Sequence, residues 1–153
     1  MYLLEPNVKK SKGGLRDLHL LQWAGMARFQ APTIRELSDR GILSRADSLA
    51  LTEAREFLWR VRALLHVHAE APQEILTFDE QVWLAQHFGY HDQPHLLAVE
   101  QFMQQYYQHT MGLHERCMRF VERCRSVPFW QRLSRFLPAP RVDEYFVVRG
   151  SLL

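Results

Sequence analysis

Apolar residues recur at spacings of three and four along most of this chain of 153 residues, and strand-like composition is confined to its last dozen positions. Such spacing is typical of amphipathic α-helices that bury one face. The sequence therefore predicts an all-α bundle of about five or six helices. A short irregular N-terminal loop precedes it, and a C-terminal tail leads from it to another domain.

The first helix is predicted to begin directly after the Gly13-Gly14 pair and to end near Phe29. Its period predicts a buried stripe of four residues with two further residues at the margins of the stripe. The stripe consists of Leu18, Leu21, Gly25 and Phe29. The margins are Leu15 and Met26.

Glycine, proline and hydroxyl residues mark the ends of the later helices. Thr33 and Ser44 have the side chains and positions of helix N-caps, and Gly41 and Gly89 are placed to end helices. In chain order the predicted helices occupy residues 33–41, 44–71, 78–89 and 93–125, the last opened by Gln93-Pro94. A short amphipathic turn is predicted at 129–136, a Pro-rich linker at 137–140 and a strand-like tail at 142–148. The sequence thus predicts a helical domain over residues 1–136, and a linker with the start of a following domain over residues 137–153.

Composition narrows the class of protein. With 47% hydrophobic and 24% charged residues, the chain matches a soluble globular domain. It has neither a membrane-spanning apolar run nor the apolar core of a signal peptide, so we expect a cytoplasmic protein that does not bind membranes. A net charge of +2 is too small to indicate nucleic-acid binding. The two cysteines, Cys117 and Cys124, lie seven residues apart in one predicted helix, which predicts two reduced thiols at the core or its boundary.

The N-terminal loop carries the most informative candidate site. Gly13 and Gly14 directly precede a helix, whose first N–H groups favour an anion, and Lys9 and Arg16 are placed to bond phosphate oxygens. The spacing is that of neither a Walker loop nor a dinucleotide fingerprint. From the residues alone, a phosphate cradle and an ordinary turn with solvated lysines both remain open.

A resemblance to a known family favours the cradle. The string LEPNVKKSKGGLRDLHLLQW at 4–23 is similar to the signature that follows the nucleotidyltransferase domain in bacterial PII uridylyltransferases. Glutamine synthetase adenylyltransferases carry a similar motif. The resemblance continues through FLWRVRALLH at 57–66, FGYHDQ at 88–93 and VEQFMQQYYQH at 99–109. Lys12 departs from the pattern, because the family commonly has proline there.

This resemblance implies a role in nitrogen regulation. Such bifunctional enzymes transfer UMP from UTP to a tyrosine of the PII signal protein with magnesium, and a metal-dependent HD domain removes it again when glutamine is plentiful. Both chemistries belong to flanking domains. The chain is therefore expected to be an accessory helical domain that is inactive alone, with residues 1–14 facing the nucleotide and no cofactor of its own.

The acidic and histidine residues of this chain do not form the expected catalytic patterns. The pairs Asp79-Glu80 and Asp143-Glu144 lack the context of a magnesium site and are interpreted as caps or surface charge. His91-Asp92 has the letters of a metal-binding pair without its helical setting. We therefore expect no catalytic residue and no metal ligand in the chain.

Arg62 and His66 share a face of the long helix predicted at 44–71 and match the family motif. One hypothesis is that they support the Arg16-Asp17 segment, by contacting the nucleotide or by fixing the loop. The alternative is a structural pair in which a buried Arg62 binds Asp17 and locks two helices together.

Two other classes of function stay open. A free-standing helical module could dock a protein partner through its basic face, residues 116–135, without catalysis. A helix-turn-helix at 34–51 is disfavoured because acidic residues are interspersed on its second helix. The aromatic residues Phe102, Tyr106 and Tyr107 are interpreted as core rather than as a base-stacking platform.

Overall fold

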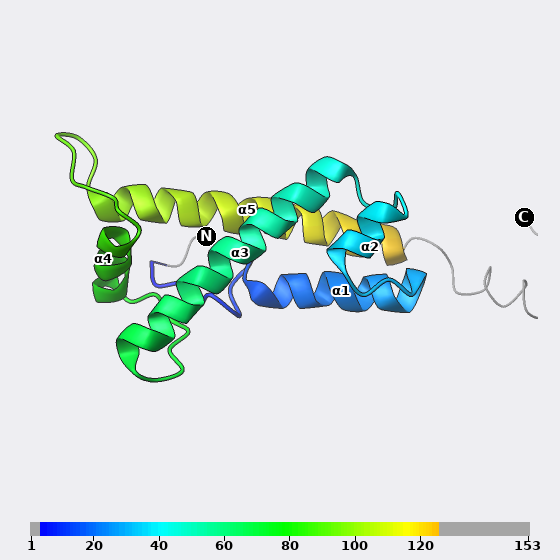
Figure 1. Cartoon of the computed structure of the whole chain (residues 1–153), viewed down its shortest axis with the longest axis horizontal. Helices are drawn as coiled ribbons and strands as arrows, with labels where there is room; N and C mark the ends of the chain where they lie inside the picture. The colour runs from blue at the N-terminus through cyan, green and yellow to red at the C-terminus, as the bar shows by residue number, and fades with distance from the viewer. Residues whose placement is uncertain (1–3, 126–153) are drawn as a thin grey trace, which may run out of the picture.

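The computed structural model describes residues 4–125, which form five α-helices joined by loops (Figure 1). The predicted all-α fold is confirmed. No β-strand occurs between residues 4 and 125, where the only extended pairings are isolated bridges between Asn7 and Ile75 and between Gln93 and Leu96. In chain order the helices are α1 (Leu15–Phe29), α2 (Ile34–Asp39), α3 (Arg45–Ala69), α4 (Phe78–His87) and α5 (Ala98–Arg125). The elements predicted at 129–136, 137–140 and 142–148, with the pair Asp143-Glu144, lie outside the described residues.

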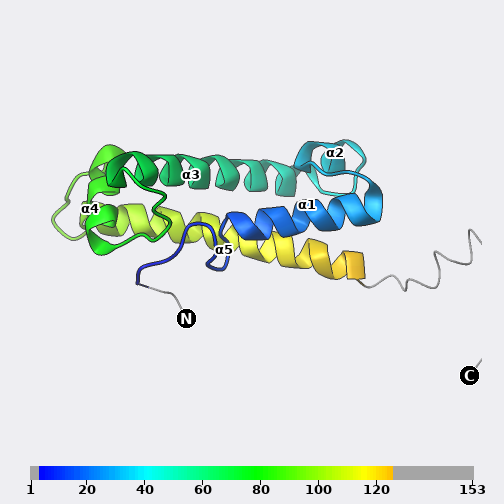
Figure 2. The same cartoon turned by 90° about the horizontal axis from the view of Figure 1, so that it is seen from below.

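Helix α5 is the element on which α1, α3 and α4 pack, whereas α2 packs on α3 and α1. Helix α1 runs beside its C-terminal half, and α3 lies across both helices in a second layer (Figures 1 and 2). Helix α4 packs at one end and α2 lies at the other. The buried face of α5 supplies much of the shared core through Phe102, Tyr106, Leu113, Cys117 and Phe120.

Side chains cap three of the helices at their N-termini. The hydroxyls of Thr33, Ser44 and Thr77 accept hydrogen bonds from the backbone N–H three residues further on. Each bond satisfies one of the N–H groups that a helix leaves unpaired at its start. The caps predicted at Thr33 and Ser44 are confirmed.

The longest helix begins later than the sequence predicts. It starts at Ala98 rather than at Gln93, because residues 93–96 close a small turn in which Gln93 and Leu96 bond each other. The side chain of Asp92 then accepts a hydrogen bond from the N–H of Ala98 at 2.8 Å. The proline at position 94 disfavours helical geometry at Gln93, which explains why the helix does not begin there.

The buried stripe of α1 is mostly as predicted. Leu18, Leu21 and Gly25 are buried, whereas Phe29 is only partly buried. Leu15, which was expected at the margin, is 2% exposed and belongs to the core. It lies where the N-terminal loop folds back on the helix, and periodicity within one helix does not register such a loop.

The cysteine and aromatic predictions agree with the structure. Cys117 is buried and Cys124 is partly buried, and both are free thiols. Phe102 and Tyr106 are buried in the core and Tyr107 packs against it, so these rings form core. No helix within residues 4–125 is long and apolar enough to cross a membrane.

Candidate functional site

The N-terminal loop, residues 4–14, is wound tightly by its own hydrogen bonds. The side-chain oxygen of Asn7 accepts bonds from the N–H groups of Lys9 and Lys10, at 3.0 and 2.7 Å. The Asn7 N–H donates in turn to the hydroxyl of Ser11 at 2.9 Å. With the backbone bonded inward, the side chains of Lys9, Lys10 and Lys12 are left exposed to solvent.

The glycine pair lets this loop pack closely. Gly13 is buried with φ of +75°, and a Cβ atom there would lie 1.9 Å from the carbonyl oxygen of Thr110 on α5. A Cβ atom on Gly14 would lie 2.7 Å from the carbonyl oxygen of Val8. Only glycine fits such a left-handed position against another backbone. In the described fold Gly13 therefore seats the loop on α5, and Gly14 lets the loop close on its own carbonyl groups.

The start of α1 is closed by the loop that precedes it. The N–H groups of Leu15 and Arg16 donate to the carbonyls of Val8 and Lys9, at 3.1 and 3.0 Å, and Asp17 N–H donates to Gly14. The expectation that these N–H groups are unpaired and available to an anion is therefore wrong. Phosphate binding by this loop would have to come from its side chains. The side chains of Lys9 and Arg16 are exposed, and a hydrogen bond joins the backbones of these two residues.

Asp17 holds the loop to two helices. Its Oδ2 atom accepts a hydrogen bond from the N–H of Gly13 at 2.8 Å and lies 2.7 Å from Nδ1 of His114 on α5. The carboxylate is thus fixed on α1 while it contacts the loop and α5 together. The supporting role of Asp17 in nucleotide binding stays a prediction, and the side-chain partner that the structure gives it on another helix is His114.

Arg62 does not pair with Asp17, and the predicted α1–α3 lock is wrong. Its Nε and Nη2 atoms instead donate to the carboxylate of Glu74, with nitrogen–oxygen distances of 2.6 to 3.0 Å. The bond from Arg62 lowers the pKa of the Glu74 carboxyl, against burial, which raises it. Nε2 of His66 lies 3.6 Å from the same carboxylate. Arg62 and His66 therefore converge on the segment between α3 and α4.

Glu74 connects that segment to the N-terminal loop. Its carbonyl oxygen accepts a hydrogen bond from the N–H of Val8 at 2.8 Å, and the Leu76 N–H donates to Pro6 at 2.9 Å. The charge of Lys9 also lowers the pKa of the Glu74 carboxyl. Arg62 and His66 thus support the loop indirectly, through Glu74. This role corresponds to the loop-fixing form of the hypothesis.

Sequence reasoning missed Glu74, His114 and Thr110. Glu74 follows Pro72 in a stretch without helical period. The sequence indicates its role only by an acidic residue that follows Arg62 and His66 in the chain. Thr110 and His114 lie almost a hundred residues from Gly13 and Asp17, which they contact. Periodicity within a helix carries no signal for such pairs.

One acidic residue was assigned the wrong role. Glu80 is neither a cap nor surface charge, since it is 8% exposed and its Oε2 atom lies 2.8 Å from Nδ1 of His68. Thr77 caps α4, and Asp79 is exposed as expected. Asp92 of the His91-Asp92 pair bonds the start of α5. Among residues 4–125, no group of three or more histidine, cysteine or acidic residues is arranged to hold a metal.

Comparison with known proteins finds a family model and similar proteins that match this chain. The family model described as GlnD PII-uridylyltransferase matches residues 1–121. Three of the similar proteins are each named bifunctional uridylyltransferase/uridylyl-removing enzyme. The one from Stutzerimonas stutzeri (strain A1501) is 37% identical over 152 residues, which are 99% of this chain and 17% of that protein.

The other two proteins have a higher identity to this chain than the first, over shorter stretches. The protein from Legionella pneumophila (strain Corby) is 46% identical over 69% of this chain and 12% of its own length. The protein from Pseudomonas aeruginosa (strain LESB58) is 43% identical over 74% of this chain and 13% of its own length. This chain therefore spans less than a fifth of each relative. No solved structure matches it.

Proposed function

The chain belongs to the PII-uridylyltransferase family, and from this membership we propose that it is the accessory helical segment of a bifunctional uridylyltransferase/uridylyl-removing enzyme. In this proposal the complete enzyme transfers UMP from UTP to a PII signal protein and removes it by hydrolysis. A nucleotidyltransferase domain with magnesium and an HD domain supply those reactions. The segment supplies no catalytic group and is inactive alone.

We further propose that the N-terminal loop binds the phosphates of UTP. The observation that carries this proposal is that a fixed loop and the first turn of α1 expose four cations, those of Lys9, Lys10 and Lys12 on the loop and Arg16 on the helix. Charge-assisted bonds from such side chains to phosphate oxygens are stronger than neutral ones. A loop held by its own backbone bonds and by Glu74 loses little conformational entropy when it binds.

The proposed division of labour follows from what each residue contacts. The side chains of Lys9 and Arg16 are exposed, and these are the residues that we expect to touch phosphate. Gly13 and Gly14 shape the loop, and Asp17, Arg62 and His66 position it. The guanidinium of Arg62 is already occupied by Glu74, so direct contact with the nucleotide is assigned to the loop instead.

The test is steady-state UMP transfer to PII by the complete enzyme that carries this segment. Arg16→Ala and Lys9→Ala should each raise KM for UTP by roughly ten- to hundred-fold, since a charge-assisted hydrogen bond contributes about 1.5–3 kcal/mol. The matched control is Arg35→Ala, because Arg35 is an exposed arginine on α2 paired only with Asp39. Unchanged KM in both loop variants, with normal folding, would remove the loop from nucleotide binding.

A further inference from the structure

An exposed tryptophan lies next to the residues that support the N-terminal loop. Trp59 on α3 is 47% exposed, although tryptophan is highly buried on average in folded proteins. The guanidinium of Arg62, one turn further along α3, lies 5.2 Å from the centre of its ring. A cation over an aromatic ring is attracted by the ring electrons. This contact therefore holds the Trp59 ring in place while about half of the side chain stays open to solvent.

The same arginine connects this ring to the loop. Arg62 bonds the carboxylate of Glu74, with a shortest distance of 2.6 Å, and the Glu74 carbonyl accepts the N–H of Val8. The charge of Lys9 acts on the same carboxylate, because it lowers the pKa of the Glu74 carboxyl. An exposed aromatic ring and an exposed cation of the loop therefore lie near one ion pair.

Two ion pairs lie beside the ring. Arg55, one turn before the tryptophan on α3, contacts Glu56 at 3.9 Å. Arg62 bonds Glu74, and Nε2 of His66 lies 3.6 Å from the same carboxylate. Neither the Arg55–Glu56 pair nor the Arg62–Glu74 pair carries a net charge. The attraction for an anion in this region therefore comes from the cations of the loop.

We propose that the exposed ring of Trp59 stacks on the base of the nucleotide whose phosphates the loop binds. This inference rests on the proposed function of the loop. Arg62 lies over the ring, so the base takes the opposite face of it. Stacking requires only the flat face of a base, which every base has. Trp59 therefore favours a nucleoside triphosphate over inorganic triphosphate without selecting one base among several.

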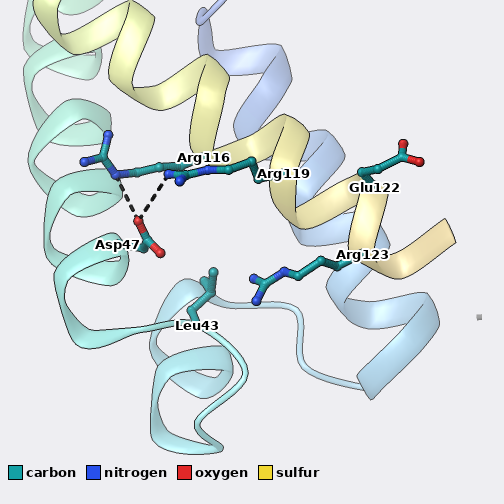
Figure 3. A pocket seen from close by; sticks show the side chains of 6 residues that line it. All are labelled: Leu43, Asp47, Arg116, Arg119, Glu122 and Arg123. Carbon is teal, nitrogen blue, oxygen red and sulfur yellow. Dashed lines mark ion pairs between the residues drawn. The ribbon is translucent and has the colours of Figure 1, made fainter. Parts of the chain in front are cut away.

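Two other features fit a nucleotide less well. Trp23 on α1 is 70% exposed, but its ring stacks on His19 of the same helix, so the support of the loop does not hold it. A hollow beside the C-terminal half of α5 carries three arginines, two of which share the carboxylate of Asp47 (Figure 3). Glu122 adds a second carboxylate, and none of the described residues that line this hollow is aromatic. The hollow therefore offers cations without a stacking surface.

The competing account gives Trp59 a structural role. Its ring packs on Arg62 and shields the Arg62–Glu74 pair from water, which strengthens the attraction within the pair. In that account the ring acts only through the position of the loop. Its removal would then weaken the binding of every ligand of the loop equally, with or without a base.

The experiment is steady-state UMP transfer by the complete enzyme that carries this segment, with inorganic triphosphate as a competitive inhibitor. Trp59→Ala should raise KM for UTP roughly five- to hundred-fold and affect kcat less, because stacking on the base is present before and during the reaction. The inhibition constant of inorganic triphosphate should stay the same. Trp59→Phe keeps an aromatic face and should keep most of the affinity for UTP. The matched control is Trp23→Ala, which should leave both constants unchanged.

Two results would overturn the assignment of Trp59. One is an unchanged KM for UTP in Trp59→Ala. The other is an equal rise of KM for UTP and of the inhibition constant of inorganic triphosphate, which would give the ring the structural role. Arg16→Ala separates both results from a failure of the loop, because it should weaken the binding of UTP and of inorganic triphosphate alike. If it weakens neither, the loop does not bind phosphate and the proposed function fails first.

Discussion

Arg62 holds the carboxylate of Glu74 through two nitrogen atoms, with a shortest distance of 2.6 Å, across the turn that separates α3 from α4. Both side chains are about four-fifths buried. Because Glu74 also bonds the backbone of Val8, this pair transmits the position of α3 to the N-terminal loop. The loop is therefore held by a charged contact whose contribution can be measured.

Removing this contact should destabilise the chain. Arg62→Met keeps most of the aliphatic stem but leaves the Glu74 carboxylate partly buried without its donor, which should cost about 1–3 kcal/mol. The measurement is the free energy of unfolding in urea. Arg55→Met on the same helix is the control, since Arg55 makes only a long contact with the neighbouring Glu56 and should change stability by less than about 0.5 kcal/mol. Equal losses in the two variants would contradict a special role for the Arg62–Glu74 pair.

The same pair should make stability depend on pH. The pKa of the Glu74 carboxyl lies below its ordinary value of 4.5, mainly because of the hydrogen bond from Arg62. A carboxyl whose pKa is lower in the folded state stabilises the fold above its unfolded pKa, and this contribution disappears as the pH falls through the folded value. The unchanged chain should therefore exceed Glu74→Gln in unfolding free energy at neutral pH. This difference should shrink as the pH falls below 4.5. A difference that stays constant down to strongly acid pH would mean that the Glu74 charge is not involved.

Gly13 and Gly41 offer a matched pair of alanine substitutions. Both have positive φ, +75° and +67°, but a Cβ atom on Gly13 would collide with Thr110, whereas nothing lies within 4 Å of one on Gly41. Gly41→Ala should cost about 1–2 kcal/mol, the penalty of left-handed geometry alone. Gly13→Ala should cost several kcal/mol more, because the loop must also move off α5. Thermal unfolding of the two variants would measure the difference, and equal losses would show that the loop is not packed on α5 as described.

The two thiols should differ in reactivity. Burial raises the pKa of the Cys117 thiol to about 12, and Cys124 is only partly buried, although burial raises its pKa as well. Because the thiolate is the reactive form, we expect a disulfide reagent to label Cys124 first and Cys117 only after unfolding. Cys124→Ser should abolish the early phase, since the chain has two cysteines. Labelling of Cys117 at the same rate in the native protein would contradict its burial on α5.

The fold was largely predictable from local sequence signals. The caps at Thr33 and Ser44, the glycine pair before α1 and the apolar period of α3 each act within a few residues, so the chain reports them directly. The start of α5 was misplaced because Pro94 was interpreted as an opening residue, whereas the structure begins the helix at Ala98.

The site was less predictable, because it is made of contacts between distant segments. The sequence pattern indicated Lys9, Arg16 and Arg62 as candidates. It did not indicate that Arg62 would bond Glu74 or that Asp17 would contact His114. The closing of the α1 N-terminus by the loop's own carbonyls also depends on backbone geometry that residue types do not determine. Phosphate binding by the loop remains a prediction from family resemblance and exposed charge.

The contact of the N-terminal loop with α5 has a consequence for the order of synthesis. Gly13 and Asp17 find their partners at Thr110 and His114, 97 residues further along in each case. At a translation rate of about 5–20 residues per second, the loop waits roughly 5–20 s on the ribosome before those partners exist. The cations of Lys9, Lys10 and Lys12 are meanwhile carried by an unanchored segment of nascent chain. The loop can acquire its final form only when residues Thr110 and His114 of α5 have emerged, so the charged loop is among the later parts of this fold to settle.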